Sequence, residues 1–188
     1  MTPLSWATKE RAAFSLVEPS RENKGAAMPD HADLPRSGGP GSTGPRSTAT
    51  LFGHPIHPML VPFPIAFFTG AFVTDIIYSR TAELQWQYFS IWLIVDGLIM
   101  GGLAAVAGMV DYAGNKRVRA LRPATPHMLL NITVMLLSLL NAFVHSRDGW
   151  TAVVPQGLIL SGIVTLLLLV SAWLGGSLTY RHGVGVAR

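Results

Sequence analysis

The chain has 188 residues, of which 49% are hydrophobic and only 13% are charged, and its mean hydropathy is +0.39. This composition excludes an ordinary soluble domain, because the apolar residues exceed what a chain of this size buries in one core. The absence of cysteine excludes disulfides and thiolate metal sites.

The first fifty residues differ in composition from the rest. The stretch RENKGAAMPDHADLPRSGGPGSTGPRSTAT, residues 21–50, is rich in Gly, Pro, Ser and charge and has almost nothing to bury. Such a composition predicts a disordered tail over residues 1–50. The tail lacks the continuous apolar core of a signal peptide, and either Met1 or Met28 suits a translation start.

Four apolar runs follow, each long enough to cross a bilayer core of about 30 Å at about 1.5 Å per helical residue. The runs cover residues 59–79, 88–112, 126–145 and 154–180. A β-barrel would need strict alternation of apolar and polar residues, whereas LLLLVSAWL is apolar at successive positions. The sequence therefore predicts an all-α membrane protein, an antiparallel bundle of four transmembrane helices over residues 51–186.

Prolines mark the predicted helix starts, because the first helical position does not need an N–H group. Pro58, Pro126 and Pro155 fit this position, and Thr125 is the predicted N-cap of the third helix. Pro62 and Pro64 lie further along the first helix and are expected to loosen its first turns.

The distribution of Lys and Arg predicts the orientation. Six lie in the tail, four in the loop over residues 113–125 and two near the C-terminus, while the other two connections carry one each. Four spans put both termini and the middle loop on one side, which the positive-inside rule makes the cytoplasmic side of a bacterial inner membrane. The basic pI near 9.9 then reflects this bias and attraction to anionic lipid, and nucleic acid is a poor alternative partner.

Polar side chains inside the spans are expected to face the bundle interior, because they are costly in lipid. At 100° per residue, one stripe of the third helix carries its polar groups: His127, Asn131, Ser138, Asn141 and His145. The opposite face carries Ile132, Leu136 and Leu140, which are expected to face lipid. The second helix carries a small-residue face, which allows close helix approach: Gly97, Gly101, Ala104 and Gly108.

The antiparallel topology sorts the polar groups into two layers. The cytoplasmic layer is expected to contain His54, His57, Asp111, His127, Asn131 and His182. The outer layer is expected to contain Asp75, Asp96, Asn141 and His145. Both layers combine histidine with carboxylate, an arrangement that suits metal ligation but equally suits buried polar pairs that only hold helices together.

Four motifs resemble a known family. They are GHPIHPMLVPFPIAF at 53–67, GMVDY at 108–112, PHMLLN at 126–131 and SAWLGGSLTYRHGVGV at 171–186. They resemble the bacterial predicted membrane proteins catalogued as domain of unknown function 2231. The resemblance implies a four-span inner-membrane domain without an established activity, sometimes found with redox partners. A third histidine usual in the family's opening motif is replaced here by Pro62.

The histidines suggest a binding module for haem b or another redox metal, acting as an accessory in membrane electron transfer. Haem iron takes axial imidazoles from facing segments, and His127 opposite His54 or His57 would supply them. The metal ligands predicted are His57 and His127, with Asp111 as the carboxylate that orients them, Asn131 beside them, and the small residues of the second helix leaving room for the macrocycle. In the alternative interpretation, His54 and His57 only bind headgroups and loop carbonyls.

Two other functions remain open. One is a non-catalytic membrane scaffold or accessory subunit, and the other is a small proton-linked carrier that uses Asp75, Asp96 and Asp111 as a relay. Four spans are few for a carrier, and the sequence shows neither broken helices nor an inverted repeat. An enzyme is least favoured, because HExxH, GxSxG and P-loop patterns are missing. Expected partners are the lipid bilayer and redox proteins or further copies of the chain.

Overall fold

The four predicted spans are present as helices in the computed structural model, which describes residues 44–147 and 152–186. The candidate spans are Ile56–Thr81, Leu84–Gly114, Ala124–His145 and Val153–Arg181. The first comprises α1 (Ile56–Leu60) and α2 (Pro62–Thr81), and the second is α3 (Leu84–Gly114). The third is α5 (Ala124–His145), and the last comprises η1 (Val153–Gly157), α7 (Leu158–Gly176) and η2 (Ser177–Arg181).

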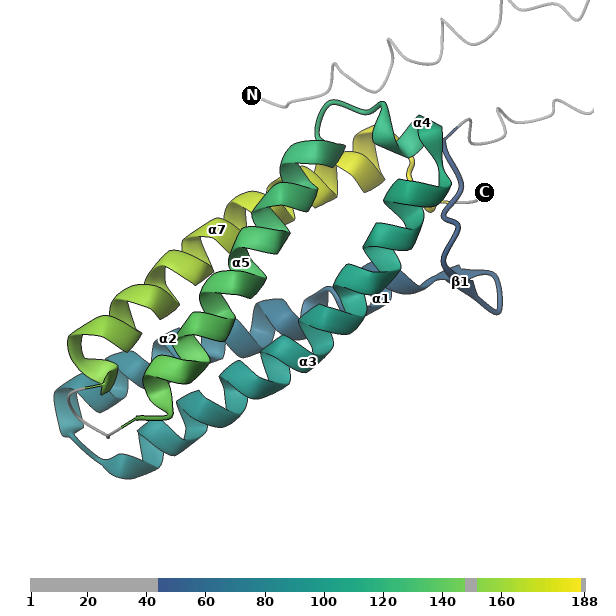
Figure 1. The fold of residues 1–188 in the computed structure, drawn as a ribbon. Helices are drawn as coiled ribbons and strands as arrows, with labels where there is room; N and C mark the ends of the chain where they lie inside the picture. Colours follow the sequence, from purple (N-terminus) through teal and green to yellow (C-terminus); the bar gives the residue numbers. More distant parts are fainter. Residues whose placement is uncertain (1–43, 148–151, 187–188) are drawn as a thin grey trace, which may run out of the picture. The chain divides into compact units, whose positions relative to one another are not determined.

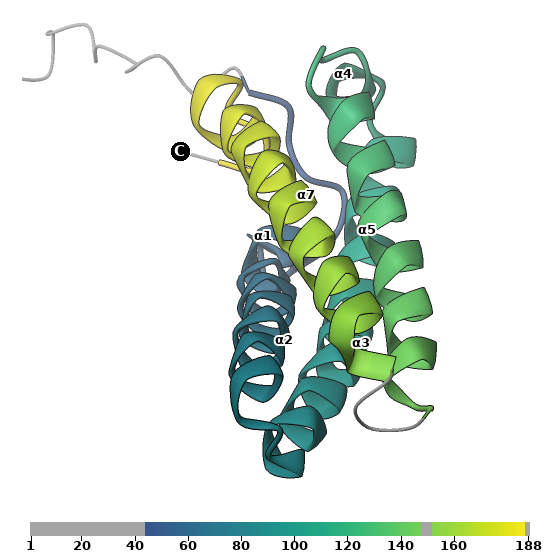
Figure 2. The same ribbon diagram turned by 90° about the vertical axis from the view of Figure 1, so that its left-hand side faces the viewer.

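The helices pack as a four-membered ring (Figures 1 and 2). α2 packs against α3 and α7, and α5 packs against the same two helices, so α2 and α5 lie diagonally across the bundle. A short helix, α4 (Lys116–Arg119), lies between α3 and α5. The fold class predicted from the sequence, an antiparallel four-helix membrane bundle, is confirmed.

The two ends of the bundle are distinct, and we name them by the segments that they contain. The proximal end carries residues 44–57, the α3–α5 connection and residues 177–186 (Figure 1). The distal end carries the α2–α3 connection and the start of η1. The predicted disordered tail lies outside the described residues up to residue 43.

Prolines shape the helix starts, although not always as predicted. The first span breaks at Val61, and Pro62 takes the first position of α2, which agrees with the expected loosening. The N-cap predicted at Thr125 is wrong, because α5 already begins at Ala124. The Thr125 hydroxyl lies instead 3.0 Å from the hydroxyl of Tyr112, which ties the two helices together.

Residues upstream of the predicted domain start at residue 51 already pack against the proximal end. The Asp111 carboxylate, near the end of α3, accepts hydrogen bonds from the Ser47 hydroxyl at 2.8 Å and from the Thr48 and Ala49 N–H groups at 2.6 and 2.7 Å. The backbone then forms a two-residue antiparallel pair, β1 (Thr50–Leu51) with β2 (His54–Pro55). This strap, residues 44–55, covers one side of the α3 terminus.

An apolar core occupies the middle of the bundle. It consists of Phe68, Val134, Val164 and Leu168, with Ile65, Leu98, Met135, Leu137 and Leu167 packed around it. The outward faces are apolar as well, as lipid requires: Ile132, Leu136 and Leu140 are exposed, whereas Ser138, Asn141 and His145 are buried. The predicted polar stripe of α5 is therefore confirmed.

The second pair of helices repeats the first. The buried positions Pro64, Phe68, Ala71, Thr74 and Asp75 of α2 recur 70 residues later as Val134, Ser138, Asn141, Val144 and His145 of α5. Most buried positions of α3 recur 67 residues later in the last span, for example Ala104 as Ser171 and Asp111 as Leu178. The chain is thus a parallel repeat of one helical hairpin, with its pseudo-two-fold axis along the bundle, and diagonal helices carry equivalent residues.

Candidate functional sites at the two ends of the bundle

At the proximal end, two histidines meet across the bundle. His57 lies on α1, His127 lies in the first turn of α5, and both are half-buried. Their ring centroids are 6.1 Å apart and their planes are inclined at 85°. The two residues are equivalent in the repeat, so the pseudo-two-fold axis brings like side chains together.

Each ring is fixed by a backbone carbonyl. His57 Nδ1 lies 2.7 Å from the Ala104 carbonyl oxygen, and His127 Nδ1 lies 2.9 Å from that of Ser171. A carbonyl oxygen can only accept, so each Nδ1 carries the proton and donates it. Each Nε2 is left with a lone pair, the state in which imidazole binds a metal.

A glycine four residues after each carbonyl-bearing residue leaves space for the imidazole ring. A Cβ atom on Gly108 would lie 2.9 Å from Cε1 of His57, and one on Gly175 would lie 3.0 Å from Cε1 of His127. A side chain at either position would push the imidazole off its carbonyl. Gly108 of α3 and Gly175 of α7 therefore each leave space for a histidine ring from a neighbouring helix.

The side chains that pack against the α3 glycines correct the expectation that these glycines leave space for haem. Gly97 accommodates the ring of Phe68 and Gly101 accommodates the sulfur of Met135, whose atoms lie 2.6 and 2.8 Å from a built Cβ. The small-residue face of α3 was expected to leave room for a haem macrocycle, and that expectation is wrong, because side chains of this chain fill it.

The other residues predicted for this site lie near it with different partners. Asn131 is in contact, since its side-chain NH₂ donates to the His127 carbonyl at 2.7 Å and lies 3.2 Å from His127 Nε2. His54 is exposed on β2, and its Nδ1 contacts the Phe52 carbonyl. The Asp111 carboxylate holds the strap and, among the described residues, orients no imidazole.

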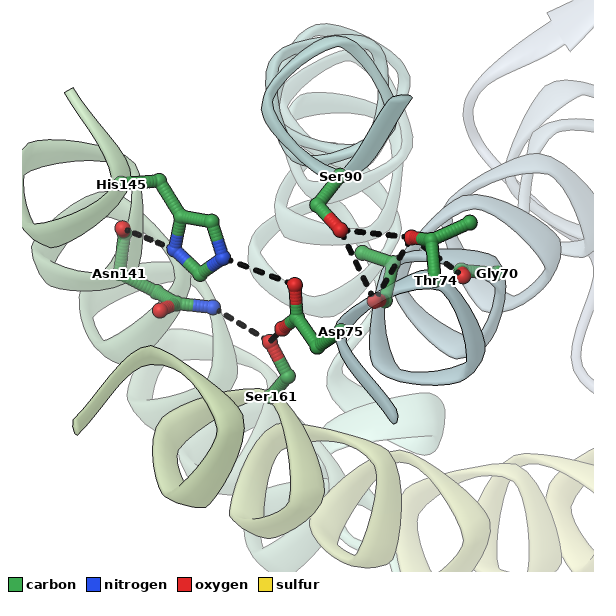
Figure 3. Close-up of polar contacts among 8 residues, drawn as sticks. Gly70, Thr74, Asp75, Ser90, Asn141, His145 and Ser161 are labelled. Carbon is green, nitrogen blue, oxygen red and sulfur yellow. Dashed lines mark hydrogen bonds and ion pairs between the residues drawn. The ribbon is translucent and has the colours of Figure 1, made fainter. Parts of the chain in front are cut away.

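At the distal end, a buried polar network joins three helices (Figure 3). Asp75 of α2 and His145 of α5 are both fully buried, and Oδ1 of Asp75 lies 2.9 Å from Nε2 of His145. Ser161 of α7 donates to the second carboxylate oxygen at 2.5 Å. Asn141 donates in turn to the Ser161 hydroxyl at 2.8 Å.

The hydrogen bonds of this network define its charge. His145 Nδ1 faces the Asn141 carbonyl at 3.0 Å, so Nδ1 is a donor. The Nε2–Oδ1 bond then contains one proton, whichever of the two atoms holds it. The imidazole and carboxylate together are neutral overall, which is the condition under which such a pair tolerates burial inside a membrane.

A second, smaller hydroxyl pair lies beside the network. The hydroxyls of Thr74 on α2 and Ser90 on α3 are 2.6 Å apart (Figure 3). The Thr74 hydroxyl donates to the Ala71 carbonyl at 2.9 Å. Ser138 Oγ and Asn141 Oδ1 are buried without a hydrogen-bond partner among the described residues. The distal end is thus a polar layer that holds all four helices together.

The three acids suggested as a proton relay are not brought together. Asp75 belongs to the distal network, Asp111 holds the strap at the proximal end, and Asp96 lies half-exposed on α3. The polar layers are about 27 Å apart, since 18 residues separate His127 from His145, and the apolar core fills the space between them. The relay hypothesis therefore has no support in the geometry.

Sequence reasoning missed three small residues of the two sites. Ser161, Ser171 and Gly175 were not singled out, because serine and glycine are common in transmembrane helices. A signal was nevertheless present: His57 and Asp75 are 18 residues apart, as are His127 and His145. This equal spacing is a sequence signal of the repeat.

A known family of proteins matches most of the chain. No curated protein and no solved structure matches the chain. A family model described as "Predicted membrane protein (DUF2231)" matches residues 53–188, which cover all four spans. The chain therefore belongs to this family of membrane proteins.

Proposed function

We propose that the protein binds one redox-active copper ion between His57 and His127 and serves as an accessory in membrane electron transfer. The observation that carries the proposal is the 6.1 Å separation of the two ring centroids. An ion about 2 Å from each imidazole nitrogen places two ring centres about 6 Å apart. Both Nδ1 atoms are already used as donors, so both Nε2 atoms are available to the ion.

The donor set favours copper(I) over other metals. Within residues 44–147 and 152–186, no three His, Cys, Asp or Glu side chains gather into a metal site, whereas zinc usually takes four ligands. Two neutral imidazoles suit a monovalent copper ion, which accepts two-coordination, and copper is a good imidazole binder. Haem b, which also needs only two imidazoles, is less favoured because the glycines beside the rings are filled.

The side chain of Asn131 contacts His127 Nε2, one of the two proposed ligand atoms. Its NH₂ group makes a short bond to the His127 carbonyl and a longer contact with Nε2, at 2.7 and 3.2 Å. An ion displaces only the longer of the two contacts. Asn131 is therefore a positioning residue that keeps Nε2 satisfied when no ion is bound.

We also propose that the proximal end faces the cytoplasm of a bacterium and that residues 51–186, together with the strap, form one membrane domain preceded by a tail. The support is charge: the exposed side chains of Lys116, Arg117, Arg119 and Arg122 gather at this end. A copper site at this end lies near the membrane surface, within reach of a redox partner protein.

The test is copper binding by the detergent-purified protein. We expect one equivalent of copper(I) in competition with a chromogenic chelator under anaerobic conditions, and X-ray absorption that shows two nitrogen neighbours. His57→Ala and His127→Ala should each abolish binding, whereas His54→Ala, an exposed histidine three residues from His57, should bind as the unmodified protein does.

Two outcomes contradict the proposal. A Soret band in the purified protein that disappears in His57→Ala assigns the pair to haem. Failure of the unmodified protein to bind copper removes any metal role. The distal network, which holds three helices together with no ligand, then favours a membrane scaffold.

A further inference from the structure

Asp96 differs from every other aspartate and histidine inside the four spans. Asp75, Asp111, His57, His127 and His145 all have hydrogen-bond partners. Asp96 is half-exposed and makes no hydrogen bond or ion pair with any described residue. An acid that contacts lipid without a partner is strongly disfavoured.

Its depth makes this exposure costly. Asp96 lies twelve residues after Leu84 and eighteen before Gly114, which places it about 18 Å from the distal end of α3 and about 27 Å from the proximal end. A helix of this length extends beyond the hydrocarbon core on both sides, so Asp96 lies inside that core. Its partner must come from outside the described part of the chain.

A hydrogen-bond donor lies one turn away on the same helix face. The Trp92 side chain is 66% exposed, and its indole N–H, which can only donate, has no partner among the described residues. The two residues belong to a row that we call the α3 seam: Phe89, Trp92, Asp96, Ile99, Leu103, Val106 and Val110. The alternating spacing of three and four residues is that of a left-handed helix pair.

We propose that two copies of this chain associate through their α3 seams, about a two-fold axis along the membrane normal. In this dimer the Trp92 indole of each copy donates to the Asp96 carboxyl of the other. Helical side chains lean toward the N-terminus, so the carboxyl leans toward the turn of the facing helix that carries Trp92. A two-fold interface satisfies both donors and both acceptors at once.

A second copy of the chain fits the α3 seam because the hydrogen-bonding groups of two seams match each other. It offers one donor and one acceptor, one turn apart, on an otherwise apolar surface. A single polar residue in such a seam sets the register of two helices at a cost in packing. This proposal is independent of copper binding, because the seam lies on the outside of α3 and the histidine pair inside the bundle.

The absence of native cysteine makes the interface directly testable. Ile99→Cys and Leu103→Cys, on the seam, should form disulfide-linked dimers when bacterial membranes are oxidised with iodine. The matched controls are Leu136→Cys on α5 and Leu166→Cys on α7, whose native side chains are 62% and 65% exposed. These controls should remain monomeric.

The hydrogen bonds are tested by substitution. Asp96→Leu and Trp92→Phe should each weaken the dimer about ten- to a hundredfold in energy-transfer measurements on labelled protein in vesicles, because two symmetry-related bonds are lost together. The double variant should be no weaker than the weaker single variant, and Asp96→Asn, which retains an acceptor, should stay within about tenfold of the unmodified protein.

Three results overturn the proposal. The first is equal crosslinking at seam and control positions, which indicates random collision. The second is a seam cysteine that yields only monomer or an adduct with a different protein. The third is an Asp96→Leu variant that associates as the unmodified protein does. Because Asp96→Leu places an apolar side chain on a lipid-facing surface, we expect it to fold, and unchanged far-UV circular dichroism checks this.

Discussion

The distal network allows a quantitative test of what holds the bundle together. Asp75 makes two buried hydrogen bonds, one with His145 and one with Ser161, and these join α2 to helices 70 and 86 residues further along the chain. Asp75→Ala leaves both side chains buried without their partner. His145→Ala leaves Oδ1 of Asp75 without its partner.

The expected magnitudes follow from these contacts. Removing one partner of a buried ion pair costs about 3–5 kcal/mol in soluble proteins. Interhelical hydrogen bonds in membranes average about 0.6 kcal/mol, because the unfolded helices find other partners. Since Asp75 makes two bonds and both side chains are fully buried, we expect each single variant to lose about 2–4 kcal/mol of unfolding free energy.

The double variant is the decisive measurement. With both partners gone, only Ser161 loses an acceptor, so we expect Asp75→Ala/His145→Ala to be about as stable as the less stable single variant. The coupling energy then equals the loss of the more stable single variant, about 2–4 kcal/mol. Unfolding free energies can be measured by dodecyl sulfate titration in mixed micelles, followed by far-UV circular dichroism.

A matched control is available on the same helix. The Thr133 hydroxyl is exposed and donates to the Leu129 carbonyl within α5, so Thr133→Ala should change the unfolding free energy by less than about 0.5 kcal/mol. A double variant whose loss equals the sum of the single losses would show that Asp75 and His145 act independently. That result would refute the paired network as the source of stability.

Three further predictions concern the proximal end and the orientation. Gly175→Ala should displace the His127 ring, lower stability by about 1–3 kcal/mol and impair copper binding, whereas Gly102→Ala, with no atom within 4 Å of its Cβ, should be neutral in both assays. Asp111→Ala should release the strap, seen as faster proteolysis within residues 44–50, without loss of copper binding; a large loss of affinity would instead give Asp111 a role in orienting the ligands. Reporters fused after Arg188 or inserted within residues 116–122 should read cytoplasmic and one near Glu83 periplasmic, and a periplasmic C-terminus would contradict the orientation.

The fold class follows from the amino-acid sequence alone. Lipid forces backbone groups to pair within each span, so four apolar runs of sufficient length specify four helices, and their bounds agree with the structure within a few residues. The polar stripe of α5 was predictable for the same reason, because helical phase alone decides which side chains avoid lipid. The gathering of His57 and His127 at one end also follows from antiparallel topology, since both residues open helices that start from the same end.

Which polar groups meet depends on how the helices pack. Asp75, Asp96 and Asp111 are alike in sequence, yet one is paired with His145, one is left on an outer face and one holds the strap. Their different roles depend on which helices lie diagonally across the bundle and how each is rotated, and the apolar runs do not encode this order. The glycines of α3 show the same limit: a small residue permits close approach, but the packing of neighbouring helices determines whether a cofactor or a side chain such as Phe68 fills the space.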